Sequence, residues 1–326
     1  DSEKMIGQEF PHIYSASIYY IPVFVCLCHI IHLILQEKCA KMIVKKSVHK
    51  KCEGETMGMN FLYPGGLRKA LTFSYDDGQI FDRRLAELLR SHGMKGTFHL
   101  NSGRLDPGRG NETFVGKEEL KETYAGHEIA CHGVEHRYPT LLTEQQLVLE
   151  IQEDRKALEK LTGGLVQGMS YAYGNYDDGV IRVARSLGIK YSRTVNSTGG
   201  FFPPADFMQW HPTCHHNDSL LERGDSFLNA ADFIELPLMY VWGHSFEFGY
   251  SGDWSVIEAF VERMAGKEDI WYATNMEIYT YINAVKQQEF SADGTTMYNP
   301  TAHSVWVSTK EGFLEVKPGE KCEKNF

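Results

Sequence analysis

From Leu62 onward, short apolar runs alternate with stretches in which apolar residues recur every three to four positions. The short runs predict β-strands, and the periodic stretches predict amphipathic helices. The predicted strands are KALTFSY (69–75), KGTFHLN (95–101), HEIACH (127–132), GMSYAY (168–173), KYSRTVN (190–196) and ELPLMYVWGH (235–244). This alternation is typical of βα units arranged around a parallel sheet or barrel.

The periodic stretches predict helices over 81–90, 143–162, 180–187 and 255–264. The second of these has the clearest ends, because Thr143 and Gln146 have the spacing of a capping box and a Gly-Gly pair follows residue 162. Residues 271–285 predict a further strand that leads into a helix, with Asn275 as the N-cap residue.

The pattern changes at the C-terminal end of the chain. Apolar and polar residues alternate over 295–320, and Gly312 lies at an expected turn, which predicts a β-hairpin. We therefore expect a main catalytic domain over 59–290, followed by a β-rich extension over 291–326.

Residues 1–58 form an N-terminal extension with a different composition. Its segment 13–35 carries no formal charge and is long enough to cross a bilayer. The lysines that follow it would hold the C-terminal side of such a span in the cytoplasm, and their position does not fit a signal peptide. We favour the alternative that the segment is not native sequence, with a start near Met59 and a cytoplasmic catalytic domain. A membrane anchor is the other interpretation.

Composition limits the classes of function. The chain has 326 residues, 42% of them hydrophobic, and a net charge of −10, from 33 basic and 43 acidic side chains. A protein that binds nucleic acid regardless of sequence needs a strongly basic face, so we expect no nucleic-acid partner. The seven cysteines show no paired spacing, which argues against a disulfide scaffold or a four-cysteine zinc site.

Polar residues follow the downstream ends of the predicted strands. They are Asp76, Asp77, Asn101, His132, Tyr173, Arg193 and His244. Active sites of parallel α/β folds form at the carboxyl edge of the sheet, so one edge is expected to gather these side chains.

Two motifs in this set suggest a metal centre. SYDDG places Asp76 and Asp77 behind an apolar strand, although Asp-Asp-Gly is also an ordinary turn sequence. CHGVEH places His132 and His136 four positions apart, a spacing that can bring both imidazoles to one face. Two imidazoles and one carboxylate suit Zn²⁺ or another divalent ion with open coordination positions.

The chain from about Ala70 to Val285 resembles the NodB-type polysaccharide deacetylases of carbohydrate esterase family 4. The family motif TFDDG reads SYDDG here, and the motif H-S/T-x-x-H reads HGVEH. The resemblance implies a distorted (β/α) barrel, with Asp76 as general base. It also implies one divalent metal ion, with zinc as the default, and the ligands Asp77, His132 and His136. The late motif LPLMYVWGH implies His244 as the general acid.

The third motif of the family, R-x-P-Y, is only partly present as SYAYG. Tyr173 matches, and by resemblance its backbone N–H would stabilise the oxyanion. Ser170 stands at the position of the arginine, which in the family contacts the base aspartate. We hypothesise that Arg193 supplies this cation to Asp76 instead; a surface salt bridge is the alternative role for Arg193.

The segment FFPPADFMQWHPTCHHND (201–218) is rich in aromatic residues and histidines. One interpretation is a loop over the active site, in which Trp210 stacks on a sugar ring and His215 or His216 reaches the substrate; the alternative is a packed loop. A second metal site made of His211, His215 and His216 is a further possibility. Glu247 has two possible roles, to orient His244 or to lie exposed at a helix start.

Together these features predict a metal-dependent hydrolase that removes N-acetyl groups from an amino-sugar polysaccharide or oligosaccharide. The first alternative is an enzyme of the same fold that acts on O-acetyl xylan, a formamide or a cyclic amide, because specificity lies in the loops. The second is a catalytically silent carbohydrate-binding protein.

Overall fold

The computed structural model describes residues 60–108, 110, 113–309 and 312–323. The segment 13–35 and the alternative start sites lie outside these residues. Within the described part of the chain, no helix combines the length and the apolar character that a membrane span needs.

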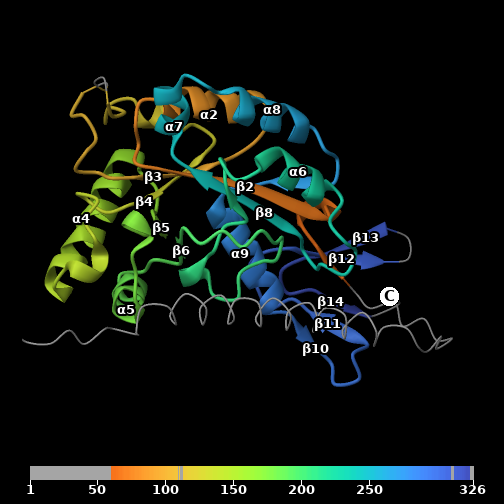
Figure 1. Ribbon diagram of the computed structural model, residues 1–326. Helices are drawn as coiled ribbons and strands as arrows, with labels where there is room; N and C mark the ends of the chain where they lie inside the picture. The colour runs from red at the N-terminus through yellow and green to blue at the C-terminus, as the bar shows by residue number, and fades with distance from the viewer. Residues whose placement is uncertain (1–59, 109, 111–112, 310–311, 324–326) are drawn as a thin grey trace, which may run out of the picture. The chain divides into compact units, whose positions relative to one another are not determined.

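Eight parallel strands form the central sheet, in the order β6-β5-β4-β3-β2-β8-β7, with β9 also paired to β2 (Figure 1). The strands are β2 (Lys69–Asp76), β3 (Thr97–Leu100), β4 (Glu128–Cys131), β5 (Gly168–Ser170), β6 (Tyr191–Arg193), β7 (Cys214–His215), β8 (Leu238–Gly243) and β9 (Ile270–Tyr272). All six strands predicted before residue 245 are present, and β9 begins the predicted strand-to-helix segment. Of these eight strands of the central sheet, only β7 was not predicted.

The segment that contains β7 closes the sheet into a distorted barrel. Trp210 pairs with Arg193 at the β6 edge, where the N–H of Trp210 donates to the carbonyl of Ser192 at 3.0 Å. A few residues later, the N–H of Thr213 donates to the carbonyl of Tyr240 in β8 at 2.8 Å. The expected (β/α) barrel is therefore confirmed, with one short irregular segment completing it.

The helices α2 (Asp82–Ser91), α4 (Glu144–Thr162), α5 (Asp178–Ser186), α8 (Ser255–Met264) and α9 (Asn275–Lys286) agree with the predicted ones, and the additional helices are α3 (Leu120–Thr123), α6 (Leu220–Leu228) and α7 (Ser245–Ser251). The capping box of α4 is present, and Gly163 ends the helix in the left-handed conformation at φ +80°. The predicted cap of α9 was wrong. Thr274, not Asn275, accepts from the N–H of Glu277 and forms a capping box with it.

Residues after α9 build two small antiparallel sheets. The hairpin of β12 (Val305–Thr309) and β13 (Gly312–Val316) confirms the predicted one, and β12 also pairs with β1 (Phe61–Leu62). The second sheet contains β10 (Glu289–Phe290), β11 (Thr296–Tyr298) and β14 (Lys321–Glu323). Buried Val305, Val307 and Val316 belong to the same apolar cluster as side chains of α9. The C-terminal strands therefore pack against this helix.

Candidate active site

The SYDDG segment turns sharply where β2 ends. Asp77 has φ +82° and Gly78 has φ +68°, and the N–H of Asp77 donates to the carbonyl of His99 at 3.0 Å. A positive φ is unfavourable for a residue with a side chain and persists where the surrounding structure holds it, often at functional sites. The turn leaves the residues Asp76 and Asp77 only 3% and 9% exposed. SYDDG is thus a turn that also presents two buried carboxylates.

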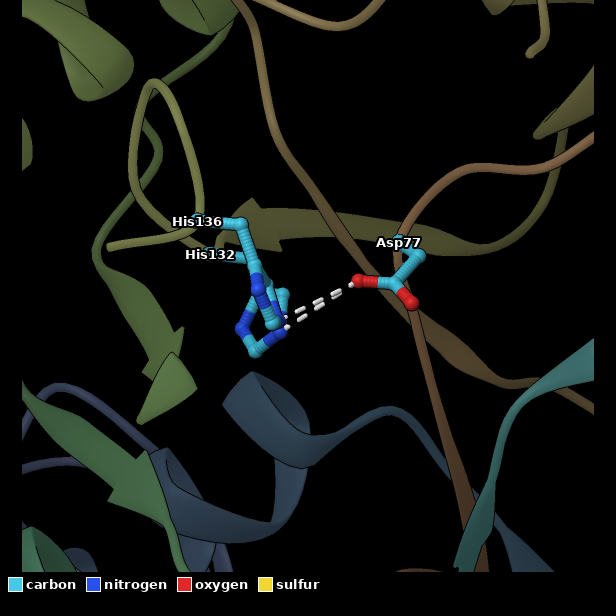
Figure 2. Close-up of side chains that lie close together, drawn as sticks. All are labelled: Asp77, His132 and His136. Atoms are coloured by element: carbon cyan, nitrogen blue, oxygen red, sulfur yellow. Dashed lines mark ion pairs between the residues drawn. The ribbon is translucent and has the colours of Figure 1, made fainter. Parts of the chain in front are cut away.

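The HGVEH segment follows β4 and brings two imidazoles to Asp77 (Figure 2). Oδ1 of Asp77 lies 3.7 Å from Nε2 of His132 and 3.5 Å from Nε2 of His136. Two donors bound to one tetrahedral zinc ion at ordinary ligand distances lie roughly 3.3–3.6 Å apart. The three side chains form a group that could hold one metal ion.

The contacts of these donors also suit a metal ion. Nδ1 of His132 lies 3.0 Å from the carbonyl oxygen and 2.7 Å from Oγ of Ser170, so it carries the proton and leaves Nε2 free as a ligand. Burial and the neighbouring His132 lower the pKa of His136 to about 4, so this imidazole is neutral at neutral pH. Oδ1 of Asp77 is buried and has no hydrogen-bond partner within the described ranges. These residues therefore fit a divalent ion.

Two buried carboxylates of α4 hold the backbone around the imidazoles. Asp154 accepts hydrogen bonds from the backbone N–H groups of Ser102, His132 and Gly133, at 2.8, 3.0 and 3.0 Å. Glu150 accepts from the backbone N–H of Glu135 at 2.8 Å. The helix thereby fixes the loop that carries both candidate ligands.

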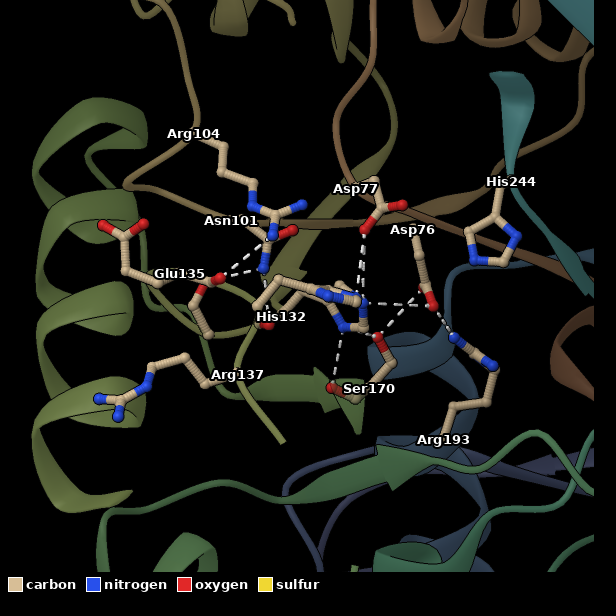
Figure 3. A network of polar contacts seen from close by, with 12 residues as sticks. Asp76, Asp77, Asn101, Arg104, His132, Glu135, Arg137, Ser170, Arg193 and His244 are labelled. Atoms are coloured by element: carbon tan, nitrogen blue, oxygen red, sulfur yellow. Dashed lines mark hydrogen bonds and ion pairs between the residues drawn. The ribbon is translucent and has the colours of Figure 1, made fainter. Parts of the chain in front are cut away.

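Asp76 lies beside this group and is joined to it through His132 and Ser170 (Figure 3). Its carboxylate contacts the guanidinium of Arg193 and accepts from Oγ of Ser170 at 3.1 Å. Arg193 is fully buried, donates to Oγ of Ser74 at 3.1 Å and lies 4.3 Å from the ring centre of Trp242. Burial alone would raise the pKa of Asp76, but the charge of Arg193, together with the smaller effects of His132, His99 and His244, outweighs burial and holds this pKa well below its usual range.

His244 lies on the other side of the two aspartates from His132 (Figure 3). Its Nδ1 is 2.7 Å from Oε1 of Glu247. Burial by itself would lower the pKa of His244, but the bond to Glu247 and the charges of Asp76 and Asp77 raise it above its usual value. Of the two roles considered for Glu247, the structure therefore favours orientation of His244.

A second group of possible ligands surrounds the same glutamate. Nε2 of His215 lies 3.2 Å from Oε1 of Glu247, and Nε2 of His216 lies 3.3 Å from Oε2. The N–H of Asn217 donates to Nδ1 of His215 at 3.2 Å, so the proton of neutral His215 is on Nε2 and points at the glutamate. Glu247 thus lies within reach of both imidazoles, in a group that could also hold a metal ion. His211 lies apart from it, with Nδ1 2.6 Å from Oγ1 of Thr194.

Two substrate-binding predictions need correction. Trp210 is 1% exposed and packs against the rings of Tyr191, Tyr240 and Phe207, because its segment closes the barrel. His216 is fully buried between other rings. Neither side chain can contact a substrate.

The other two candidates for substrate contact are accessible. The side chain of His215 is 21% exposed, and Tyr173 is 50% exposed beside His136.

Sequence reasoning missed three residues of the site: Ser170, Glu150 and Asp154. The two acidic residues did carry a signal, because they lie four positions apart on the apolar side of the predicted 143–162 helix. A charged pair on a face that should be buried usually has a specific partner. Ser170 was noted only as the residue at the position of the motif arginine, and no role was assigned to it.

The barrel thus carries a buried Asp-His-His group that could hold a metal ion, with a second aspartate beside it. Residues 65–192 match the family model described as polysaccharide deacetylase. The match supports a hydrolase that acts on amide bonds, and it agrees with the resemblance found in the motifs.

Individual relatives are distant. Chitin deacetylase 1 of Cryptococcus neoformans var. grubii is 28% identical over 145 residues, which cover 42% of this chain and 28% of the relative. The chain thus spans little more than a quarter of that protein.

Two solved structures show the same fold. One is a putative polysaccharide deacetylase of Mycobacterium smegmatis, with a TM-score of 0.50, 16% identity, and coverage of 70% of this chain and 94% of the other. The second is the allantoinase PuuE, with a TM-score of 0.51, 14% identity, and coverage of 67% and 91%.

Proposed function

We propose that this domain is a metal-dependent hydrolase that removes N-acetyl groups from an amino-sugar polysaccharide or oligosaccharide. The observation that carries the proposal is the convergence of Asp77, His132 and His136 directly beside a buried, ionised Asp76. A family of polysaccharide deacetylases and a chitin deacetylase as relative support the substrate class.

In the proposed reaction, Asp77, His132 and His136 hold one divalent ion, with Zn²⁺ as the expected metal. When bound, such an ion lowers the pKa of water and polarises an acyl carbonyl. Asp76 takes the proton of the attacking water, and the charge of Arg193 keeps Asp76 ionised for this step. The backbone N–H of Tyr173 is the proposed donor to the oxyanion.

His244 completes the proposed reaction as general acid. Its raised pKa favours the protonated imidazole, which can transfer a proton to the departing amine. Glu247 holds the ring by accepting the hydrogen bond from Nδ1, so that Nε2 is the nitrogen left to face the substrate. Acetate and the free amino sugar are the products.

One experiment tests the metal and the reaction together. Metal content by elemental analysis and acetate release from chitooligosaccharides are measured on the wild type, Asp77→Ala and His132→Ala. The matched control is His303→Ala, an exposed histidine of the C-terminal region. We expect one metal ion per chain in the wild type and the control, and loss of metal and acetate release in both site variants.

The same samples separate the alternatives. The fold is shared with an allantoinase, so acetylxylan and allantoin are assayed in parallel. If the protein hydrolyses one of these compounds and releases no acetate from chitooligosaccharides, it is a hydrolase with a different substrate from the one proposed. If the wild type binds no metal and turns over none of these compounds, the enzymatic function is refuted. The alternative of a catalytically silent carbohydrate-binding protein would then remain.

A further inference from the structure

Two exposed tyrosines lie beside the loop that carries His136. Tyr138 follows it in the chain, and Tyr173 follows β5. Their rings are parallel, with a centroid distance of 3.9 Å and an interplanar angle of 4°. The two residues are 47% and 50% exposed. Exposed aromatic surface next to a catalytic centre is a mark of a binding site.

The pair continues a row of rings that begins at the candidate metal ligands. Ring centroids are 4.7 Å apart between His132 and His136, and 4.3 Å apart between His136 and Tyr173. Tyr138 stacks on Tyr173 at the outer end. Because Tyr173 covers one face of Tyr138, the exposed half of Tyr138 consists of its other face and its rim. The row therefore leads from the reacting centre to an open aromatic surface.

The two loops that carry the tyrosines are tied together. Oδ1 of Asn175 accepts from the backbone N–H of Thr140 at 2.9 Å and from its Oγ1 at 2.7 Å. Pro139 is buried and restricts the backbone directly after Tyr138. Tyr173 has φ +58°, a conformation that costs free energy and is held in place by its surroundings. The pair is thus preorganised, which reduces the entropy that a ligand must lose on binding.

We propose that Tyr138 and Tyr173 form a carbohydrate-binding subsite for the sugar residue next to the one that is deacetylated. This inference rests on the proposed function, and it makes an oligosaccharide or polymer, not a monosaccharide, the preferred substrate. A pyranose ring has an apolar face of C–H groups and a rim of hydroxyls. A tyrosine ring offers an apolar face to the first and a polar tip to the second. Within the described ranges, neither tyrosine hydroxyl has a hydrogen-bond partner in the protein, so both are available to sugar hydroxyls.

The test compares Tyr138→Ala with Tyr138→Phe, which keeps the ring. The control is Phe233→Ala, which removes an aromatic side chain that is 81% exposed elsewhere on the surface. Acetate release is measured with N-acetylchitotetraose and with p-nitrophenyl acetate, a probe too small to reach Tyr138. We expect Tyr138→Ala to lower kcat/KM for the tetramer about tenfold, mainly through KM, and to leave the probe reaction unchanged. The other two variants should behave as the wild type.

A binding measurement separates the subsite from the reaction. Affinity for the tetramer is measured by calorimetry in an Asp76→Asn background, with and without Tyr138→Ala. A roughly tenfold loss of affinity on removal of the ring supports the subsite, even if the wild type releases no acetate and the proposed function fails. Equal affinity with and without Tyr138, or no binding in either protein, would overturn the subsite whatever the acetate assay shows.

Discussion

The guanidinium of Arg193 contacts the carboxylate of Asp76, although 117 positions separate the two residues in the chain. Arg193 comes from the end of β6, and Asp76 from the end of β2. Ser170, which stands where the family motif has its arginine, lies at the end of β5 and donates to the same carboxylate. A cation from β6, the strand next to β5, thus occupies the space beside Asp76.

Arg193→Ala is expected to lower kcat by about 100-fold or more. Without the guanidinium, burial raises the pKa of Asp76, so the base is protonated over a wider range. The acidic limb of the kcat/KM profile should therefore move to higher pH. The profile is recorded beside Arg193→Lys, which keeps the charge, and Arg185→Ala, which breaks an exposed ion pair with Asp206. An unchanged kcat and profile in Arg193→Ala would dispose of this role.

Three features could be predicted from short stretches of the sequence: the main strands, the site motifs and the role of Arg193. A strand such as β2 shows its apolar run, and parallel strands place their carboxyl ends at one edge. Trp210 could not be placed in this way. The same aromatic residue suits a substrate platform and a barrel core, and only the closure of the sheet by its segment decides between them.

Short elements and tertiary partners were also beyond sequence reasoning. β7 contains only Cys214 and His215, too few residues for a periodic signal. Asn275 is a good N-cap residue by type, but its side chain instead contacts Thr72 and Tyr240 in the barrel, and Thr274 takes the cap. The contacts of Glu247 with His215 and His216 could not be predicted either, because only the fold brings these residues together.

Ser170→Ala should weaken metal binding and turnover together. The hydroxyl of Ser170 contacts both Nδ1 of His132 and the carboxylate of Asp76, so its loss frees the imidazole and removes one bond to the base. Loss of such a partner typically costs about 10- to 100-fold in metal affinity or activity. Affinity for Zn²⁺ is measured by competition with a chelator, with Ser226→Ala on the exposed face of α6 as the control. Wild-type affinity would show that the backbone carbonyl of Ser170 alone orients His132.

Glu247→Gln should move the alkaline limb of the kcat/KM profile to lower pH. The bond from Nδ1 of His244 to the glutamate helps to raise the pKa of this imidazole, and a neutral amide removes the negative charge. A general acid works only while protonated, so a lower pKa ends activity at a lower pH. The profile of Glu268→Gln, an exposed glutamate, provides the comparison. If the alkaline limb of Glu247→Gln stays at the pH of the wild type, a group other than His244 determines that limb.

Asp82→Asn should flatten the dependence of stability on pH. Asp82 is fully buried and accepts hydrogen bonds from Ser245 and Tyr124, and burial raises its pKa from 3.8 to about 7 although these bonds lower it in part. Between these values the folded state binds one more proton than the unfolded state. The stability that this group contributes below about pH 4 is therefore lost as pH rises towards 7.

The size of this effect can be measured by urea unfolding. Between pH 5 and 7, the titration of Asp82 lowers the free energy of unfolding by roughly 1 kcal/mol per pH unit. The variant, which has no titrating group at this position, should lose less stability than the wild type over this interval. Parallel curves for the two proteins would mean that Asp82 keeps an ordinary pKa in the folded state.

Trp210 variants should change stability and leave substrate recognition intact. The indole is buried where the barrel closes, in edge contacts with Tyr191 and Phe207, and its backbone pairs with β6. Truncation of a buried aromatic residue to alanine typically costs about 3–5 kcal/mol, so Trp210→Ala should lower Tm strongly. Trp210→Phe retains most of the packing and should keep the KM of the wild type for chitooligosaccharides. A large rise in KM with unchanged Tm in Trp210→Phe would instead restore the indole as a substrate platform, and would require the closing segment to open when substrate binds.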